Sequence, residues 1–168
     1  MNHDNHSALV LAIHPITNGF GYVLMTSPLS PVDFGVKSIR RNEKNAESLK
    51  AVAALIETHN PEVLVLEDPT APGSQRRPRI RRLVDAIVAY AQNEVLDLRV
   101  LSRDQVRECF KSVSARTRQE IAVSIAHRVP ALKRFLPPPR KRWNSESSNM
   151  SIFAAAALAL TYFHSWSR

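Results

Sequence analysis

Apolar and polar residues alternate in short blocks along the first forty residues of the chain. The segment 8–13 (ALVLAI) is almost continuously apolar, which is typical of a central strand covered on both faces. Asn18 and Gly19 mark a turn, and the segments 20–25 and 32–39 then predict a second strand and a third strand nearer the edge of a sheet. Three successive strands joined by short turns favour an antiparallel meander.

Helical and extended patterns alternate in the next part of the chain. Apolar residues at helical spacing predict a helix over 42–59, with Asn42 or Asn45 as its cap. A buried strand over 63–66 (VLVL), a helix over 78–95 and a short strand over 98–101 follow in that order. Strands separated by helices are expected to be parallel. The chain therefore predicts an α/β fold with a mixed five-stranded sheet flanked by helices.

The C-terminal part is mainly helical. Ser102 is expected to cap a helix that runs to about residue 110, and the capping-box spacing of Thr117 and Glu120 predicts another over 117–128. An alanine-rich last helix over 149–163 is suited to close packing on the sheet.

Two segments are expected to lie outside the regular elements. Residues 1–6 predict a disordered tail before a single domain over 7–168. The segment 136–148, which contains PPPRKRWNSESS, has no periodicity and predicts an exposed, mobile loop rich in basic residues.

Charge is the first indication of a partner. The 168 residues carry a net charge of +8. Residues 1–68 hold five Lys or Arg and eight Asp or Glu, whereas residues 69–168 hold eighteen and seven. This asymmetry favours a polyanion, most simply nucleic acid, over the alternative of an inert basic surface.

The same sequence argues against membrane and secreted classes. No apolar run reaches the roughly 20 residues of a membrane span. The N-terminal segment lacks the basic region of a secretory signal, and the single cysteine, Cys109, cannot form an internal disulfide. We therefore expect a cytoplasmic protein that does not associate with membranes.

Two polar elements follow predicted central strands. His14 comes after the segment 8–13, and Glu67 and Asp68 come after 63–66. Functional groups of such sheets gather at the carboxyl ends of neighbouring strands. The start of the last helix could join them. A metal-dependent nuclease needs this kind of convergence, because two or three carboxylates must hold the cations that activate water.

The order of elements, the second strand with its Asn-Gly-Phe-Gly-Tyr start at 18–22, and VLVLED at 63–68 resemble the RuvC-type Holliday junction resolvases and, more broadly, the ribonuclease H-like fold. The final AALALTYFH (156–164) resembles the last helix of that family. The resemblance covers residues 8–164. It implies metal-dependent cleavage of branched DNA, with Mg²⁺ or Mn²⁺ as cofactor.

The resemblance carries over to single residues only in part. Glu67 matches the family's glutamate at the end of the fourth strand, and Asp68 stands beside it as a second metal ligand. His14 occupies the place of the aspartate that ends the first strand. The last-helix aspartates fall among Phe153 to Ala156, which carry no ligand atoms, and Glu146 in the preceding loop is the nearest acid.

These departures leave two hypotheses open for the site. In the first, neutral His14 binds Mn²⁺ or acts as a general base, and Glu146 joins Glu67 and Asp68 as a late ligand. In the second, the site has lost its metals, because Mg²⁺ prefers oxygen ligands and only one of two successive strand-end carboxylates faces the site. The sequence favours a degenerate site or one with altered chemistry over an ordinary RuvC-type site.

Two basic clusters are the strongest positive signal. The first lies at a loop-to-helix junction and the second lies in the loop before the last helix. Arginine forks suit phosphate oxygens, and a tryptophan can stack on a base. The predicted nucleic-acid-binding residues are Arg76, Arg77, Arg79, Arg81, Arg82, Arg140, Lys141, Arg142 and Trp143.

The sequence therefore predicts a RuvC-like protein that binds branched or structured DNA, with nuclease activity left open. The first alternative is an inactive nuclease homologue that binds DNA or a protein. The second is a small-molecule enzyme that uses the same cleft. Cutting both strands of a junction implies a homodimer, whose interface the helix after Arg82 or the last helix could supply.

Overall fold

The computed structural model describes residues 7–40 and 42–166, so the predicted N-terminal tail lies outside the described residues. The strands are β1 (Val10–Ile16), β2 (Gly19–Ser27), β3 (Ser30–Ser38), β4 (Val63–Glu67) and β5 (Asp97–Leu101). The helices are α1 (Lys44–His59), α2 (Pro78–Asn93), α3 (Arg103–Lys111), α4 (Arg118–Arg128), the 3₁₀ helix η1 (Pro130–Phe135) and α5 (Met150–Trp166). None of the described helices is long and apolar enough to cross a membrane.

The strands form the predicted mixed sheet, in the order β3-β2-β1-β4-β5. The pairs β1–β2 and β2–β3 are antiparallel, whereas β1–β4 and β4–β5 are parallel. The expectation that β3 lies at an edge is confirmed. Strand β1 runs past its predicted end, because His14 and Pro15 still pair with Gly21 and Phe20 of the hairpin.

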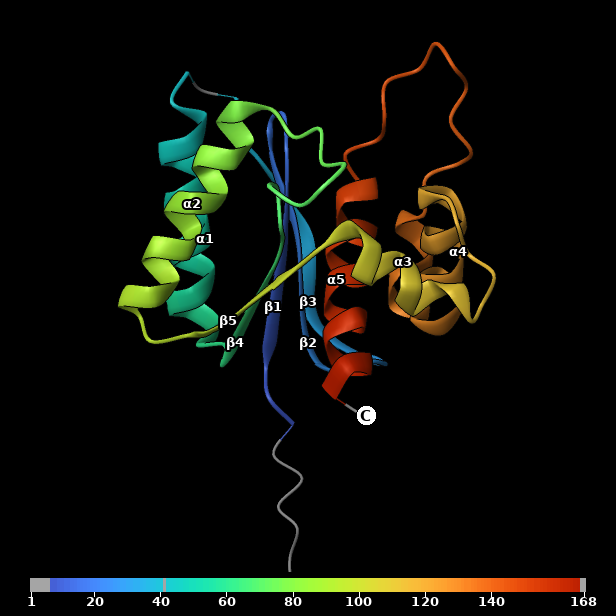
Figure 1. Ribbon diagram of the computed structural model, residues 1–168, viewed down its shortest axis with the longest axis horizontal. Helices are drawn as coiled ribbons and strands as arrows, with labels where there is room; N and C mark the ends of the chain where they lie inside the picture. The colour runs from blue at the N-terminus through green and yellow to red at the C-terminus, as the bar shows by residue number, and fades with distance from the viewer. Residues whose placement is uncertain (1–6, 41, 167–168) are drawn as a thin grey trace, which may run out of the picture.

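Helices cover both faces of the sheet (Figure 1). Helices α1 and α2 lie on one face, and α3, α4 and α5 lie on the other. Alternate residues of β1 enter different cores: Leu11 and Ile13 pack with α1 and α2, whereas Val10 and Ala12 pack with the helices of the other face. This alternation follows from the two-residue period of a strand, and it explains why β1 is apolar throughout.

Helix α5 packs directly onto β2 and β1. A Cβ atom at Gly21 would overlap the side chain and backbone of Ser151, in the first turn of α5. The glycine therefore permits this close approach, at the residue that pairs with His14. The prediction that the start of the last helix joins the strand ends is confirmed.

Two of the three predicted N-caps are confirmed. Ser102 with Gln105 and Thr117 with Glu120 form complete capping boxes. The predicted cap of α1 is wrong, because Glu43 occupies the N-cap position and no side chain caps the helix. Asn45 instead exchanges hydrogen bonds with Arg79, which donates to its amide oxygen at 2.9 Å.

Candidate functional site

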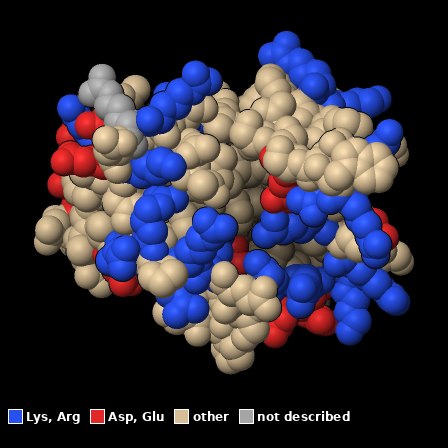
Figure 2. Space-filling model, turned by 90° about the horizontal axis from the view of Figure 1, so that it is seen from above, with Lys and Arg blue, Asp and Glu red and all other residues tan. Residues whose placement is uncertain are grey.

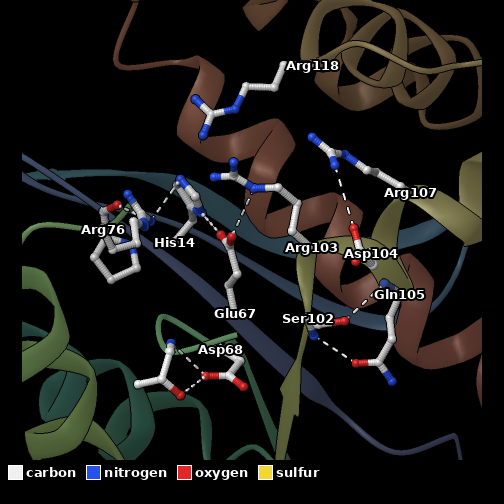
Figure 3. Close-up of polar contacts among 12 residues, drawn as sticks. His14, Glu67, Asp68, Arg76, Ser102, Arg103, Asp104, Gln105, Arg107 and Arg118 are labelled. Atoms are coloured by element: carbon white, nitrogen blue, oxygen red, sulfur yellow. Dashed lines mark hydrogen bonds and ion pairs between the residues drawn. The ribbon is translucent and has the colours of Figure 1, made fainter. Parts of the chain in front are cut away.

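The parallel pairing of β1 and β4 brings His14 and Glu67 together at the C-terminal edge of the sheet (Figure 3). The distance between Nδ1 of His14 and Oε2 of Glu67 is 3.6 Å, and the two side chains are only 7% and 12% exposed. A buried histidine and a buried carboxylate are each costly to charge unless they have partners. Arg103 supplies such a partner for Glu67, whereas the arginines beside His14 favour its neutral form.

Arg76 approaches His14 from the loop between β4 and α2. Its Nη2 donates to the carbonyl oxygen of Pro15 at 2.9 Å and lies 3.3 Å from Nε2 of His14. A guanidinium has no acceptor, so Nε2 of His14 is the accepting nitrogen and the ring proton belongs on Nδ1, facing Glu67.

The electrostatics of the site keep His14 in this neutral form. Burial lowers the pKa of His14 well below 6.5, and the positive charges of Arg76, Arg118 and Arg103 lower this pKa further. Burial also lowers the pKa of Arg76, and the negative charge of Glu67 offsets part of this effect by raising the pKa. His14 is therefore a neutral hydrogen-bonding residue at physiological pH.

Arg103 reaches Glu67 from the other side. Glu67 pairs with Leu101 in the β4–β5 register, and Ser102 then starts α3 through its capping box. Arg103, the first residue of the helix, is thereby delivered to the strand end. Its Nε lies 3.5 Å from Oε1 of Glu67, so both carboxylate oxygens of Glu67 have a nitrogen partner.

Asp68 does not join this site. Its backbone N–H donates to the carbonyl oxygen of Leu101 at 2.8 Å, which extends the β4–β5 ladder by one residue. Its Oδ1 accepts from the backbone N–H and from the hydroxyl of Thr70, both at 2.8 Å. Asp68 therefore shapes the start of the loop and points away from Glu67 (Figure 3).

Glu146, predicted as a late ligand, is also held elsewhere. Both of its carboxylate oxygens accept from Nη1 of Arg118, at 3.1 and 3.0 Å. This ion pair ties the loop before α5 to the first turn of α4. The structure thus brings together His14 and Glu67 of the four predicted catalytic residues, and not Asp68 or Glu146.

The donor set at the strand ends does not fit Mg²⁺ or Mn²⁺. No group of three or more His, Cys, Asp or Glu side chains that could hold a metal ion occurs among the residues that the structure describes. Among the described residues, Glu67 is the single carboxylate beside His14, and Arg103 already pairs with it. Helix α5 presents Phe153, Ala154 and Ala157 to the site. Divalent cations of this kind need several free oxygen ligands.

A cavity of about 330 Å³ opens beside His14 and Glu67, between α3, α4 and α5. Its floor is apolar and comes mostly from α5, while arginines of α3 and of the segment that starts α4 surround it. Those arginines are Arg103, Arg107, Arg116 and Arg118. Figure 2, which looks onto this end of the molecule, shows a hollow bordered by Lys and Arg on several sides.

The first predicted basic cluster divides into two kinds of arginine. Arg76 and Arg79 turn inward, where Arg79 donates to the carbonyl oxygens of Ile16 and Thr17 at 3.4 and 2.8 Å. These two arginines fasten the loop and α2 to the β1–β2 hairpin. The outward members are Arg77, Arg81 and Arg82, which are exposed.

The second predicted cluster lies on the long loop before α5 and is exposed throughout. Trp143 is 81% exposed. The Nζ of Lys141 lies 5.7 Å from the centre of its ring, and Arg140 and Arg142 flank the pair. An exposed indole beside cations is suited to stacking on a nucleic-acid base, so both clusters leave groups available to a polyanion.

Sequence reasoning missed the arginines around the cavity. Arg103 and Arg118 are the first residues of α3 and α4, and Arg116 immediately precedes the cap of α4. The two capping boxes placed these helix starts correctly. The cap at Ser102 directly after β5 was the signal, because it places the first residue of α3, Arg103, beside the C-terminal end of β4, where Glu67 lies.

Comparisons with known proteins identify the fold. No protein-family model matches the chain, and no curated protein matches it either. Among solved structures, RuvC of Thermus thermophilus in complex with a Holliday junction substrate has a TM-score of 0.66 at 15% identity, over 95% of this chain and 96% of that one. The yeast mitochondrial Holliday junction resolvase has a TM-score of 0.63 at 15% identity, over 94% and 78%.

A viral structure has the same arrangement. The fowlpox virus Holliday junction resolvase has a TM-score of 0.55 at 14% identity, over 94% of this chain and 99% of that one. These similarities extend over nearly the whole chain and agree with the order and direction of the strands. The chain therefore has the ribonuclease H-like fold in the form found in the RuvC-type resolvases.

Proposed function

We propose that this protein binds branched or structured DNA through the arginine-rich end of its sheet and does not cleave it by metal-dependent hydrolysis. The observation that carries this proposal is the pairing of Glu67 with Arg103 and His14. Two-metal cleavage requires carboxylates free to bind cations. Here the strand-end carboxylate is already neutralised, and the site as a whole is positively charged.

The distribution of cations supports a DNA partner. The exposed arginines of α2, those around the cavity and the loop residues near Trp143 all lie toward one end of the molecule (Figures 1 and 2). Arginine binds phosphate oxygens with two parallel hydrogen bonds, which favours nucleic acid over a diffuse acidic surface. The fold shared with a RuvC bound to a Holliday junction makes branched DNA the first substrate to test.

The test is a binding and cleavage assay on labelled four-way junction, duplex and single-stranded DNA, with Mg²⁺, with Mn²⁺ and with a chelator. We expect salt-sensitive binding that does not depend on metal, tightest for the junction, and no cleavage. Replacing Arg77, Arg81 and Arg82 with Ala should weaken binding and reduce the salt slope by about 0.9 for each phosphate that the variant no longer neutralises. The exposed Arg128 at the far end of α4 provides a matched control, Arg128→Ala, which should bind normally.

Two results would contradict the proposal. Metal-dependent cleavage that Glu67→Gln abolishes would show that the strand-end site is an active nuclease. Absence of binding to all three DNA forms at low salt would remove the nucleic-acid function and favour a protein or small-molecule partner. Tight binding without cleavage is the expected outcome.

A homodimer remains a prediction, and the burial of each helix indicates which of them could form its interface. Helix α5 is covered by the sheet on one side and by α3 and α4 on the other, so it has little free surface to offer a second copy. Helix α2 keeps an exposed face that includes Arg81, Arg82 and Asp85. Sedimentation of the protein with and without junction DNA would measure the stoichiometry directly.

A further inference from the structure

We propose that the cavity between α3, α4 and α5 is a binding site for one unstacked nucleotide, with the base on its apolar floor and the phosphate on Arg118. The inference rests on the proposed function when the nucleotide belongs to a DNA strand. The same chemistry would also accept a free mononucleotide.

The floor of the cavity has the character that a nucleobase requires. It is formed by side chains such as Ile121 of α4 and Phe153, Ala154 and Ala157 of α5. Ala154 lies between buried residues of α5, but it is itself only partly buried because it lines the cavity. Small side chains there leave a hollow that a flat, largely apolar ring can enter.

The size of the cavity matches a small ligand. Its volume of about 330 Å³ lies at the lower end of the roughly 300–1,000 Å³ typical of small-molecule sites. A duplex cannot enter a hollow of this size between three helices, whereas a single nucleotide that has left its stack can. Extrusion costs a few kcal/mol and is least costly where bases are already unpaired, as at a branch point.

Arg118 is the phosphate-binding group of this site. It lines both the cavity and the adjoining groove under the loop before α5, where its guanidinium holds the carboxylate of Glu146 through two hydrogen bonds. A carboxylate held in this way shows that Arg118 can bind an anion at this point. The pair is exposed at 51% and 42%, so a phosphate can displace Glu146 at little cost.

Other charges of the cavity are consistent with an anionic ligand. Glu67 is the carboxylate on the cavity wall, and Arg103 neutralises it. Just before α4, the backbone N–H groups of Arg116 and Thr117 donate to the carboxylate of Glu120, so these two groups are not available to an anion. The arginine side chains supply the positive charge that a phosphate requires.

The first arm of the test measures binding of dAMP, deoxyadenosine and inorganic phosphate by calorimetry and by amide shifts in NMR. We expect dAMP to bind more tightly than either fragment, with shifts in α3, α4 and α5. Ala154→Leu, which fills the floor, should weaken dAMP binding at least about tenfold. Ala131→Leu makes the same change at an exposed residue of η1 that lines neither cavity, and should bind as the wild type does.

The second arm uses a four-way junction with 2-aminopurine at the branch point. At protein concentrations where anisotropy shows full binding, the wild type should raise the fluorescence of the probe, because the base leaves its stack, and Ala154→Leu should not. A dAMP signal without this increase would assign the site to free nucleotides. Thermal melts of each variant establish that it is folded.

Two outcomes would overturn the proposal. One is dAMP binding that is absent in the wild type or unchanged in Ala154→Leu. The other is a fluorescence increase that persists in Ala154→Leu. Failure of the wild type to bind any junction would contradict the proposed function. The dAMP measurement would still show whether the cavity binds a nucleotide.

Discussion

Two sets of arginines are in opposite states. The inner arginines, Arg76 and Arg103, lie at the strand ends beside His14 and Glu67, and Arg76 also donates to the backbone of β1. The outer arginines at the start of α2, Arg77, Arg81 and Arg82, are exposed. The first set stabilises the fold and the second remains available to a partner. The partners within reach, rather than residue type, decide which role an arginine has here.

The same pairing explains why the strand ends do not fit a divalent cation. A carboxylate that binds Mg²⁺ must keep its oxygens free of other cations. Glu67 instead has Arg103 on one oxygen and His14 beside the other. The inner group, which is His14 and Glu67 with Arg76 and Arg103, is thus linked by hydrogen bonds and ion pairs that leave neither oxygen of Glu67 without a nitrogen partner.

The largest expected effect is a loss of stability in Arg76→Ala that Arg77→Ala does not show. Arg76→Ala removes the donor to Pro15 and to His14, and hydrogen bonds of charged groups contribute about 1.5–3 kcal/mol. We expect the free energy of unfolding, measured by urea denaturation, to fall by about that amount. The matched variant Arg77→Ala should change stability by less than about 0.5 kcal/mol while weakening DNA binding. Equal stability losses in the two variants would contradict the division into inner and outer arginines.

A second prediction concerns a variant designed to bind a metal ion beside Glu67. The triple variant His14→Asp, Arg103→Gln and Ala154→Asp places carboxylates around Glu67 and removes its cation partner. At Mn²⁺ concentrations near one hundred times the dissociation constant, bound metal would stabilise this variant by roughly 2.7 kcal/mol. The wild type should show no shift in its melting temperature with Mn²⁺. Stabilisation of the wild type by Mn²⁺ would contradict the fit argument.

A third prediction concerns pH. The folded protein keeps His14 neutral because its pKa is lowered below 6.5, whereas the unfolded chain takes up a proton as the pH falls through 6.5. Stability is therefore lost as the pH decreases below that value, with a slope of at most about 1.4 kcal/mol per pH unit from this group.

The variant His14→Gln isolates this contribution. Its amide can still accept from Arg76, but it does not titrate. We expect the difference in unfolding free energy between wild type and variant to shift in favour of the variant as the pH falls from 7 toward 5. Parallel stability profiles would mean that folding does not lower the pKa of His14.

The smallest expected effect on stability is at the outer ion pair. Glu146→Gln breaks its ion pair with Arg118, and exposed pairs of this kind contribute about 0.2–1 kcal/mol. The variant should therefore be nearly as stable as the wild type. It should bind DNA more tightly, by a few fold, because the competing carboxylate is gone. Weaker binding would show that Glu146 orders the loop for DNA and does not compete with it.

Local patterns were sufficient to predict most of the fold. Continuous apolar runs identified β1 and β4 as buried strands, and the capping boxes at Ser102 and Thr117 located two helices. The cap of α1 failed, because Asn45 has a tertiary partner in Arg79 that no local rule reveals. Local rules succeed where the partner is three or four residues away and fail where it is 34 residues away.

The sequence by itself determined that His14 and Glu67 lie toward the ends of central strands, that no carboxylate lies at the start of α5, and that positive charge gathers in the second half of the chain. Only the tertiary structure decided what those groups do. Arg76 and Arg103 reach the strand ends from separate elements, and Asp68 and Glu146 are bound elsewhere. Each of these outcomes depends on which side chains are buried beside which charges, and the free energy of a buried charge is set by neighbours that the order of residues does not specify.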